Sequence, residues 1–415
     1  MNIKELYSLY KENPKISTDS RKIYKNSIFF SLKGEKFDGN NFVDEALKKG
    51  ASYAIIDNPI HQKKGTILVK DCLATLQELA KHHRLSLNIP IIGITGTNGK
   101  TTSKELIKTS LQSKFNIYAT KGNLNNHIGV PLSILEIKEK TDIAIIEMGA
   151  NHKNEIAFLC EIAKPNYGII TNIGKAHLEG FGGFKGVVKA KNELYKYIEK
   201  NKGYVFINSE DNLLVSLAKN IQKIEYGYNN ILFKNNEDIF TKIKYNNINI
   251  KSNLIGDYQM YNILLAIRVA EYFNVPIKDV KYAIENYIPK DNRSEIVKTK
   301  KNTLILDAYN ANPSSMNAML HSFAKQEGKN KLCIIGDMLE LGEFAIKEHE
   351  KIIQLNKELN LESIYIGTIF SKICKDGFKN REEFVEYILQ KPIEGKKIML
   401  KGSRSMELEK LINFL

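Results

Sequence analysis

Short apolar runs alternate with helix-like amphipathic stretches along most of the 415 residues. Each run has the length of a buried strand. Strands are expected at residues 91–94, 143–148, 167–173, 204–208 and 231–233, and helices at 73–85, 101–113, 184–200 and 258–273. This alternation predicts an α/β fold with a mostly parallel sheet.

Two breaks in the pattern predict three domains. Asn88-Ile-Pro90 precedes the strand at 91–94, and a polar stretch spans residues 289–294. The predicted units are a small N-terminal α/β domain (1–86), a central domain (87–292) and a C-terminal domain (293–415). Strands are expected in the last domain at 303–307, 331–336, 363–367 and 397–400. Each is followed by a helical pattern, so this domain should be Rossmann-like.

The composition is that of a soluble globular protein. Hydrophobic residues make up 43% of the chain and charged residues 26%, which excludes a disordered chain or a coiled-coil rod. No apolar run approaches the roughly 18 residues of a membrane span, and residues 1–20 contain no apolar signal segment. The four cysteines form no CxxC pair, so we expect a cytoplasmic protein.

The chain is basic, with 61 Lys and Arg residues against 47 Asp and Glu residues and a net charge of +14. The basic residues are spread along the chain and form no Arg-rich tract, which indicates a general compositional bias. We therefore expect no nucleic-acid partner. The field of the excess charge would help to attract polyphosphate ligands.

The most informative motif is Thr95-Gly-Thr-Asn-Gly-Lys-Thr-Thr102, which lies between an expected strand and an expected helix. Its backbone N–H groups, lysine and hydroxyls are the groups that hold a triphosphate and Mg²⁺. The strict P-loop pattern has glycine where Ile94 stands, so the match is a variant. The alternative is a turn whose glycines only relieve strain. The predicted nucleotide contacts are Gly96, Thr97, Asn98, Gly99, Lys100, Thr101 and Thr102.

Two further candidates follow strands at the same edge of the predicted sheet. Glu147 ends the strand that begins at residue 143, where a carboxylate can support Mg²⁺. His177 follows the next strand, as part of Thr171-Asn-Ile-Gly-Lys-Ala-His177. The alternatives are a solvated carboxylate for Glu147 and a structural histidine for His177.

Taken in order, these motifs resemble the Mur ligases, ATP-dependent amide ligases of bacterial cell-wall precursor synthesis. Glu147-Met-Gly-Ala-Asn151 and Lys189-Ala-Lys-Asn-Glu193 also fit the family. Segments that resemble the branch adding D-Ala-D-Ala are Asp307-Ala-Tyr-Asn-Ala-Asn-Pro-Ser314, Gly336-Asp-Met-Leu-Glu-Leu-Gly342 and Lys401-Gly-Ser-Arg-Ser405. The Asp-Asn-Pro-Arg motif of the diaminopimelate-adding branch does not occur in the sequence.

The resemblance implies an activity and a set of partners. The expected reaction joins D-Ala-D-Ala to UDP-N-acetylmuramoyl-tripeptide through an acyl phosphate, with ATP and two Mg²⁺ sites. The protein is expected to be a monomer. The expected fold has a central P-loop ATPase domain and a C-terminal Rossmann-like domain that rotates to close the cleft. Two alternatives stay open: a sister amide ligase, such as a diaminopimelate-adding enzyme or a folylpolyglutamate synthase, and a P-loop switch or kinase.

The resemblance also implies catalytic and metal roles. Lys100 would hold ATP, Thr101 and Glu147 would bind one Mg²⁺, and His177 would contact a second. Lys191 would be carbamylated by CO₂, which converts a cation into an anion beside the metals. Lys189 is a competing candidate, but Lys191 fits the family's Lys-x-x-Leu-Phe spacing.

The remaining implied roles concern the substrates. Asn262 would contact adenine, although Tyr258 and Gln259 depart from the family pattern there, and a helix-face asparagine without function is the alternative. The other expected nucleotide contacts are Arg293, Asp307, Tyr309 and Asn310, with a local turn or cap as the alternative for Asp307. The expected contacts of the UDP-linked peptide are Ser20, Arg21, Lys33, Asn125 and Asn126. For the two asparagines, a simple polar turn is the alternative.

Overall fold

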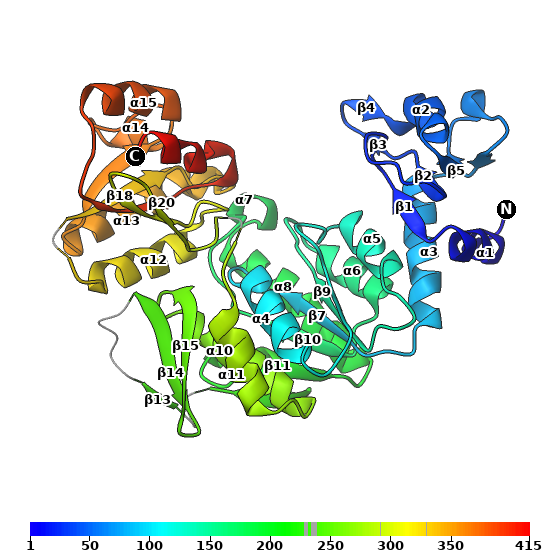
Figure 1. Cartoon of the computed structure of the whole chain (residues 1–415), viewed down its shortest axis with the longest axis horizontal. Helices are drawn as coiled ribbons and strands as arrows, with labels where there is room; N and C mark the ends of the chain where they lie inside the picture. Colours follow the sequence, from blue (N-terminus) through cyan, green and yellow to red (C-terminus); the bar gives the residue numbers. More distant parts are fainter. Residues whose placement is uncertain (228–230, 234–238, 291, 329) are drawn as a thin grey trace.

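The computed structural model describes residues 1–227, 231–233, 239–290, 292–328 and 330–415. The N-terminal and C-terminal domains lie at opposite ends of the central domain (Figure 1). The three-domain α/β fold predicted from the sequence is confirmed, with mostly parallel sheets in all three parts. Among the described residues, no helix has both the length and the apolar character needed to cross a membrane.

The N-terminal domain is built on a parallel sheet with the strand order β1-β2-β5-β6. A short antiparallel hairpin, β3–β4, projects from it. The elements are α1 (Ile3–Glu12), β1 (Lys15–Ser17), β2 (Ser27–Phe30), β3 (Lys33–Gly34), β4 (Phe37–Asp38), α2 (Val43–Lys48), β5 (Ala51–Ile56), β6 (Thr66–Leu68) and α3 (Cys72–Ser86).

The central domain contains a six-stranded parallel sheet with the order β12-β11-β10-β7-β9-β8. The neighbouring strands β7 and β9 are buried along their whole length, as expected for parallel strands covered on both faces. The elements up to β10 are β7 (Ile91–Thr95), α4 (Lys100–Leu111), β8 (Ile117–Ala119), α5 (Gly129–Leu135), β9 (Ile143–Glu147), α6 (Glu155–Ala163) and β10 (Tyr167–Ile170). The later elements are α7 (Leu178–Phe181), α8 (Phe184–Lys200), β11 (Tyr204–Asn208), α9 (Asn212–Leu217), β12 (Gln222–Tyr226), β13 (Ile231–Phe233), β14 (Phe240–Tyr245), β15 (Ile248–Ile255), α10 (Gln259–Tyr272) and α11 (Ile277–Asn286).

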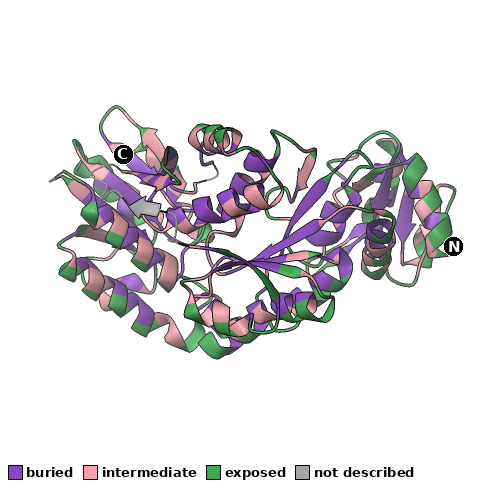
Figure 2. Cartoon of the chain, turned by 90° about the horizontal axis from the view of Figure 1, so that it is seen from below, coloured by how far each residue is buried: buried purple, intermediate pink, exposed green. Residues whose placement is uncertain are grey.

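The C-terminal domain has a five-stranded sheet with the order β16-β17-β20-β18-β19, in which only the edge strand β16 runs antiparallel. Figure 2 shows purple sheet strands, whereas many helices are purple on one face and green on the other. The elements are β16 (Glu295–Lys298), β17 (Thr303–Leu306), α12 (Pro313–Lys325), β18 (Lys331–Gly336), α13 (Ala345–Glu358), β19 (Glu362–Ile366), α14 (Phe370–Ile373), α15 (Arg381–Gln390) and β20 (Lys397–Lys401).

The structure differs from the expected strands at two places. The strand expected at 167–173 ends at Ile170, because its neighbour β7 ends at Thr95 and the chain that follows packs on the glycine-rich loop, where the hydroxyl of Thr171 donates to the carbonyl of Asn98. The strand expected at 231–233 exists, but it pairs antiparallel with β14 and lies outside the parallel sheet. Its sheet includes a tight hairpin in which Asn246 and Asn247 both have positive φ, the backbone that a two-residue hairpin turn requires.

Helix α3 fastens the N-terminal domain to the central domain. Its residue Arg84 is buried, and the guanidinium donates hydrogen bonds to the carbonyls of Ala163 (2.9 Å) and Lys164 (3.1 Å) at the end of α6. It also donates to the carbonyl of Leu87 (2.9 Å) and to Asn166 Oδ1 (3.2 Å). A cation at the C-terminus of a helix satisfies carbonyls that the helix leaves unpaired.

We expect Arg84→Ala to lower the midpoint of thermal unfolding by about 5 °C, because the loss of charged hydrogen bonds to buried carbonyls costs about 3 kcal/mol. Differential scanning calorimetry measures the shift. The control is Lys81→Ala on the same helix, whose partly exposed pair with Glu78 should change the midpoint by about 1 °C or less. Equal shifts for the two variants would contradict the anchoring role.

Candidate active site

The glycine-rich loop joins β7 to α4 through two backbone positions that need glycine. Gly99 has φ +79° and precedes the first helical residue, Lys100. Gly96 has φ +145°, and a Cβ placed there would lie 2.0 Å from Thr171 Oγ1. The loop therefore packs directly on the end of β10. Its backbone N–H groups and the N-terminus of α4 form an anion-binding arrangement.

Lys100 is folded back over this loop. Its ammonium donates hydrogen bonds to the carbonyls of Gly96 (2.8 Å) and Thr97 (3.2 Å). Loss of hydration lowers the pKa of Lys100 against the opposing attraction of Glu147, and the charge of Arg293 lowers it further. The ammonium thus stands at the position where a phosphate in the loop would meet it.

Glu147 lies at the carboxyl end of β9, next to the loop. The residue is buried, yet both carboxylate oxygens are engaged: Oε2 accepts from Thr101 Oγ1 (3.0 Å) and Oε1 accepts from Asn125 Nδ2 (2.9 Å). A buried lysine that the sequence reading did not single out, Lys104, has its Nζ 3.9 Å from Oε2. The hydroxyl and the carboxylate are hard oxygen donors of the kind that Mg²⁺ binds.

Lys191 is buried on α8, whereas the competing Lys189 is exposed on the same helix. Lys191 Nζ lies 5.6 Å from the centre of the Phe181 ring. Burial and the charge of Lys100 lower the pKa of Lys191 to about 7, with Glu193 and Glu155 opposing the shift. Of the two lysines, only Lys191 borders the cavity described below.

His177 is held in a left-handed backbone conformation, with φ +50°, just before the short helix α7. Its Nδ1 lies 2.5 Å from Oε2 of Glu340, which belongs to the C-terminal domain. His177 also lines the cavity, so the structure places this residue where the two domains meet.

Asn262 lies on α10 beneath the glycine-rich loop. Its Oδ1 accepts from Ser103 Oγ (2.9 Å), and its Nδ2 donates to Gln259 Oε1 (2.6 Å). A Cβ on Gly99 would come within 2.8 Å of Oδ1. In this arrangement the carboxamide supports the loop, and its predicted contact with adenine stays a prediction.

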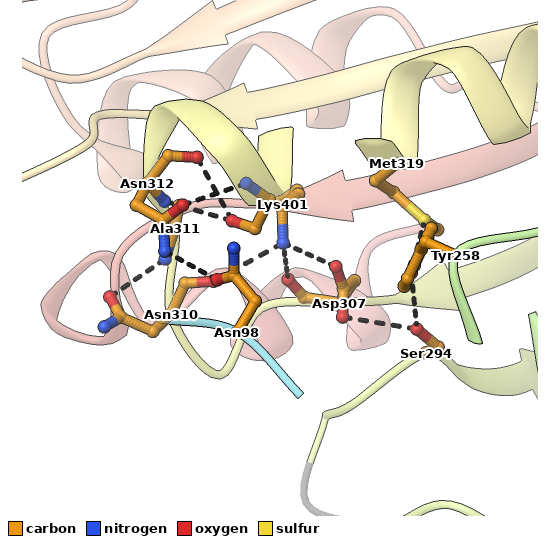
Figure 3. Close-up of polar contacts among 10 residues, drawn as sticks. Asn98, Tyr258, Ser294, Asp307, Asn310, Ala311, Asn312, Met319 and Lys401 are labelled. Atoms are coloured by element: carbon orange, nitrogen blue, oxygen red, sulfur yellow. Dashed lines mark hydrogen bonds and ion pairs between the residues drawn. The ribbon is translucent and has the colours of Figure 1, made fainter. Parts of the chain in front are cut away.

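The C-terminal domain contributes a charged wall (Figure 3). Lys401 Nζ lies 2.5 Å from Asp307 Oδ2, and Asn312 Nδ2 reaches across to Asn98 Oδ1 in the glycine-rich loop at 2.8 Å. In the same domain, the guanidinium carbon of Arg293 lies 3.6 Å from the centre of the Tyr309 ring. The sequence reading quoted Lys401 within a motif without giving it a role. Its position at the end of a strand was the available signal.

One cavity of about 1030 Å³ brings most of these residues together. It is lined by residues from the central and C-terminal domains, and of the predicted site residues it excludes Ser20, Arg21 and Lys33. The predicted residues that line it are Gly96, Thr97, Asn98, Gly99, Lys100, Thr101, Thr102, Asn125, Asn126, Glu147, His177, Lys191, Asn262, Arg293, Asp307, Tyr309 and Asn310. Further lining residues that the sequence reading did not assign include Asn172, Lys153 and His127.

The predicted substrate residues outside the cavity are all in the N-terminal domain. Ser20 Oγ donates to Glu45 Oε2 (3.4 Å), and Lys33 Nζ lies 2.9 Å from Asp57 Oδ1. Arg21 forms a two-pronged pair with Asp19 on the surface. The structure does not bring these three residues to the phosphate loop, and their predicted roles stay predictions.

Asn126 has a local structural role as well as a place in the cavity wall. Its Oδ1 accepts from the backbone N–H groups of Ile128 (3.1 Å) and Gly129 (2.8 Å) at the start of α5. By contrast, Asn125 points its amide at Glu147. The two neighbouring asparagines therefore make different contacts, one with the metal-binding candidate Glu147 and one with the start of α5.

Comparison with known proteins gives matches along most of the chain. Three domain families match: "Mur ligase family, catalytic domain" at residues 15–87, "Mur ligase middle domain" at 94–270 and "Mur ligase, glutamate ligase domain" at 292–404. A relative from Bacillus subtilis, UDP-N-acetylmuramoyl-tripeptide–D-alanyl-D-alanine ligase, is 30% identical over 96% of this chain and 92% of its own length. The chain belongs to the Mur ligase family. The resemblance expected from the motifs is thereby confirmed.

Other relatives of this Mur ligase support the same placement. A Haemophilus influenzae protein with the same name as the Bacillus subtilis relative is 35% identical over 96% of this chain and 92% of its own. The crystal structure of MurF from Acinetobacter baumannii superposes with a TM-score of 0.87 at 28% identity, covering 96% of this chain and 92% of that one. MurF ligase from Thermotoga maritima in complex with ADP gives a TM-score of 0.84 at 25% identity, covering 97% of both chains.

We expect Gly96→Ala to weaken binding of ADP by about tenfold or more, because the added methyl would displace Thr171 and distort the anion-binding backbone. Isothermal titration calorimetry measures the affinity. The matched control is Gly395→Ala, a glycine with φ +68° in the C-terminal domain whose Cβ would meet no described atom within 4 Å. A Gly96→Ala protein that binds ADP as the control does would contradict the assignment of the loop.

Proposed function

We propose that this chain joins D-Ala-D-Ala to UDP-N-acetylmuramoyl-tripeptide with consumption of ATP, as a UDP-N-acetylmuramoyl-tripeptide–D-alanyl-D-alanine ligase of peptidoglycan precursor synthesis. One observation carries the proposal. A single cavity combines a phosphate-binding loop, a buried carboxylate and a buried lysine with a charged wall from a second domain. That combination occurs in a chain whose relatives with this name align over 96% of its length.

The chemistry explains why the site contains these groups and needs no nucleophilic side chain. Amide formation from a carboxylate requires a better acyl donor, which transfer of the γ-phosphoryl group supplies as an acyl phosphate. Attack by the amine of D-Ala-D-Ala then forms the amide bond and releases phosphate. The protein has to position three substrates and stabilise the charge on the transferring group, which is the task of Lys100 and the loop N–H groups.

Mg²⁺ fits the donor groups that the site presents. Thr101 and Glu147 would hold one ion, and His177 would contact a second. Among the described residues, no group of three or more His, Cys, Asp or Glu side chains is arranged to hold a metal ion by itself. This suits Mg²⁺, which usually takes one or two protein carboxylates together with water and substrate phosphates. When bound, the ion supplies positive charge that screens the phosphate oxygens.

We also propose that Lys191 is carbamylated in the active enzyme. The neutral amine would attack the carbon of CO₂, form an N–C bond and lose a proton to water, leaving an anionic carbamate. Two observations support the modification: Lys191 is buried at the cavity, and its pKa is lowered to about 7. A carbamate would also balance the positive charge of Lys100 and of the proposed ions.

The substrate contacts complete the proposal. In the C-terminal domain (293–415), Arg293 would meet the nucleotide phosphates, and Asp307, Tyr309 and Asn310 would touch the ribose. Asn262 would lie near adenine. The N-terminal domain (1–86) would bind the uridine nucleotide through Ser20, Arg21 and Lys33, while Asn125 and Asn126 of the central domain (87–292) would line the path of the peptide.

The cellular setting and the assembly are also proposals. The substrates are a nucleoside triphosphate and a UDP-linked sugar peptide, and all four cysteines are free thiols, which suits the reducing cytoplasm. The proposed site is formed within one chain, so a monomer is sufficient for activity. Rotation of the C-terminal domain toward the central domain would exclude water from the acyl phosphate.

The proposed function is tested by phosphate release with one component omitted at a time. We expect release to require Mg-ATP, UDP-N-acetylmuramoyl-tripeptide and D-Ala-D-Ala together, with a product heavier by the dipeptide in mass spectrometry. Release with a single amino acid in place of the dipeptide would instead assign the chain to a sister ligase. Phosphate release that depends on neither the tripeptide nor the amine would support a nucleotide switch or hydrolase.

A second test addresses Lys191. We expect Lys191→Met to lower kcat by about 100-fold or more while the affinity for ADP stays within about threefold, because the residue acts on the reacting groups and not on the loop. The control Lys189→Met removes an exposed lysine two residues away and should leave kcat nearly unchanged.

Carbamylation itself has a direct readout. With ¹³C-labelled bicarbonate, the wild-type protein should show a carbamate resonance that Lys191→Met lacks. Only the neutral amine reacts with CO₂, and the pKa is lowered to about 7, so the resonance should grow as the pH rises through 7 and fade on acidification. An unmodified Lys191 at pH 8 in a fully active enzyme would refute the modification and leave the ligase assignment intact.

A further inference from the structure

The segment that carries His177 is held by the C-terminal domain as well as by its own. It runs from the end of β10 to the start of α8 and includes only the short helix α7 as regular structure. Lys175, two residues before His177, donates from its backbone N–H to Ser314 Oγ (2.8 Å) and from its Nζ to Glu348 Oε1 (2.9 Å). Both acceptors belong to the C-terminal domain, on α12 and α13.

The two domains approach closely at this point. A Cβ on Gly174 would lie 2.5 Å from Ser314 Oγ, so any larger residue there would have to displace the Ser314 side chain. Further along, the backbone N–H of Glu179 donates to the carbonyl of Glu340 (3.3 Å), and the side chain of Glu340 contacts His177. Lys175 therefore lies in a row of contacts between the domains, and His177 lies within that row.

Glu348 is a well-placed anchor for the lysine. Its side chain is only 7% exposed, and the same Oε1 accepts from Lys351 (2.7 Å), one turn along α13. Burial opposes ionisation of Glu348, but hydrogen bonds from the two lysines outweigh it and keep its pKa below the ordinary value. One carboxylate thus holds two lysines, one from each domain.

We propose that Lys175 is a positioning residue for the reaction: its ion pair with Glu348 couples the placement of the C-terminal domain to the placement of His177 in the cavity. Lys175 itself does not line the cavity, so it acts through the segment and touches no substrate. The kinetic consequence rests on the proposed function, whereas the coupling of the segment to the domain does not depend on the substrate.

The chain offers a matched control for this pair. Lys351 contacts the same carboxylate oxygen at a similar distance, and its side chain is 49% exposed compared with 43% for Lys175. The two lysines differ in that Lys351 belongs to the same helix as Glu348. Charge reversal at either position therefore places a repulsive carboxylate beside Glu348, but only Lys175→Glu acts between the domains.

The experiment compares the wild type with Lys175→Glu, Lys351→Glu and the exchanged pair Lys175→Glu/Glu348→Lys. Hydrogen exchange, measured by mass spectrometry without substrates, reports on residues 174–182. We expect exchange there to be about tenfold faster in Lys175→Glu, unchanged in Lys351→Glu and restored toward the wild type in the exchanged pair. In that pair, the half-exposed Lys351 can turn into solvent.

Steady-state kinetics then tests the consequence for catalysis. We expect kcat to fall about tenfold in Lys175→Glu, because His177 is displaced. The KM for ATP should change by a smaller factor, because the hydrogen bonds that join Gly174 to Thr97 Oγ1 of the glycine-rich loop do not involve the Lys175 side chain. Lys351→Glu should stay within about twofold of the wild type in both parameters, and the exchanged pair should recover most of kcat.

The two readouts separate the possible failures. Equal exchange in Lys175→Glu and Lys351→Glu, or a kcat loss that the exchanged pair does not restore, would overturn the coupling. A wild-type enzyme without turnover on the proposed substrates would contradict the proposed function, while the hydrogen-exchange comparison would still decide whether Lys175 ties the segment to the C-terminal domain.

Discussion

Two lysine side chains, those of Lys100 and Lys191, share one cavity, and the organisation of the site depends on how their charge is balanced. The charge of Lys100 contributes to the lowered pKa of Lys191. The pKa of Lys100 is itself lowered by burial, and the nearby carboxylate of Glu147 opposes that lowering. Positive charge in a cavity of limited hydration attracts an anion strongly, because the low local dielectric weakens screening. A polyphosphate placed on the loop N–H groups supplies that anion.

The fold explains why these charges meet. In a parallel sheet, all strands end at the same edge, so β7, β9 and β10 deliver the loop, Glu147 and Thr171 to one place. The C-terminal sheet does the same with β17 and β20, whose ends bring Asp307 against Lys401. The cavity forms where the carboxyl edges of two separate sheets face each other. Charged groups that are distant in sequence can therefore surround one substrate.

The sequence was sufficient for the parts of the site that are local. The strand, the glycines, Lys100 and Thr101 follow one another within a dozen residues, and their geometry follows from that order. The spacing of residues in the sequence also favoured Lys191 over Lys189 as the site lysine. In the structure, Lys191 is buried and Lys189 is exposed. The partners of these residues depend on tertiary packing: the contact between Asn98 and Asn312 joins positions 214 residues apart, and no local pattern encodes it. The antiparallel sheet β13–β15 was missed for a different reason: its tight hairpin at Asn246 and Asn247 is local, but the strands β14 and β15 on either side of that turn were not predicted.

The contacts that join the central domain to its two neighbours differ in burial and strength, and this difference bears on the reaction. The N-terminal domain is joined to the central domain by Arg84, whose buried guanidinium binds the carbonyls that end α6. Around Lys175, the C-terminal domain contacts the central domain through partly exposed ion pairs and single hydrogen bonds, which individually contribute about 1 kcal/mol or less. Contacts of that strength can break and re-form at each turnover, whereas a buried charged anchor cannot do so without a large cost. This difference supports the proposed rotation of the C-terminal domain against a fixed pair of N-terminal and central domains. The segment around His177 is where such a rotation would reach the cavity.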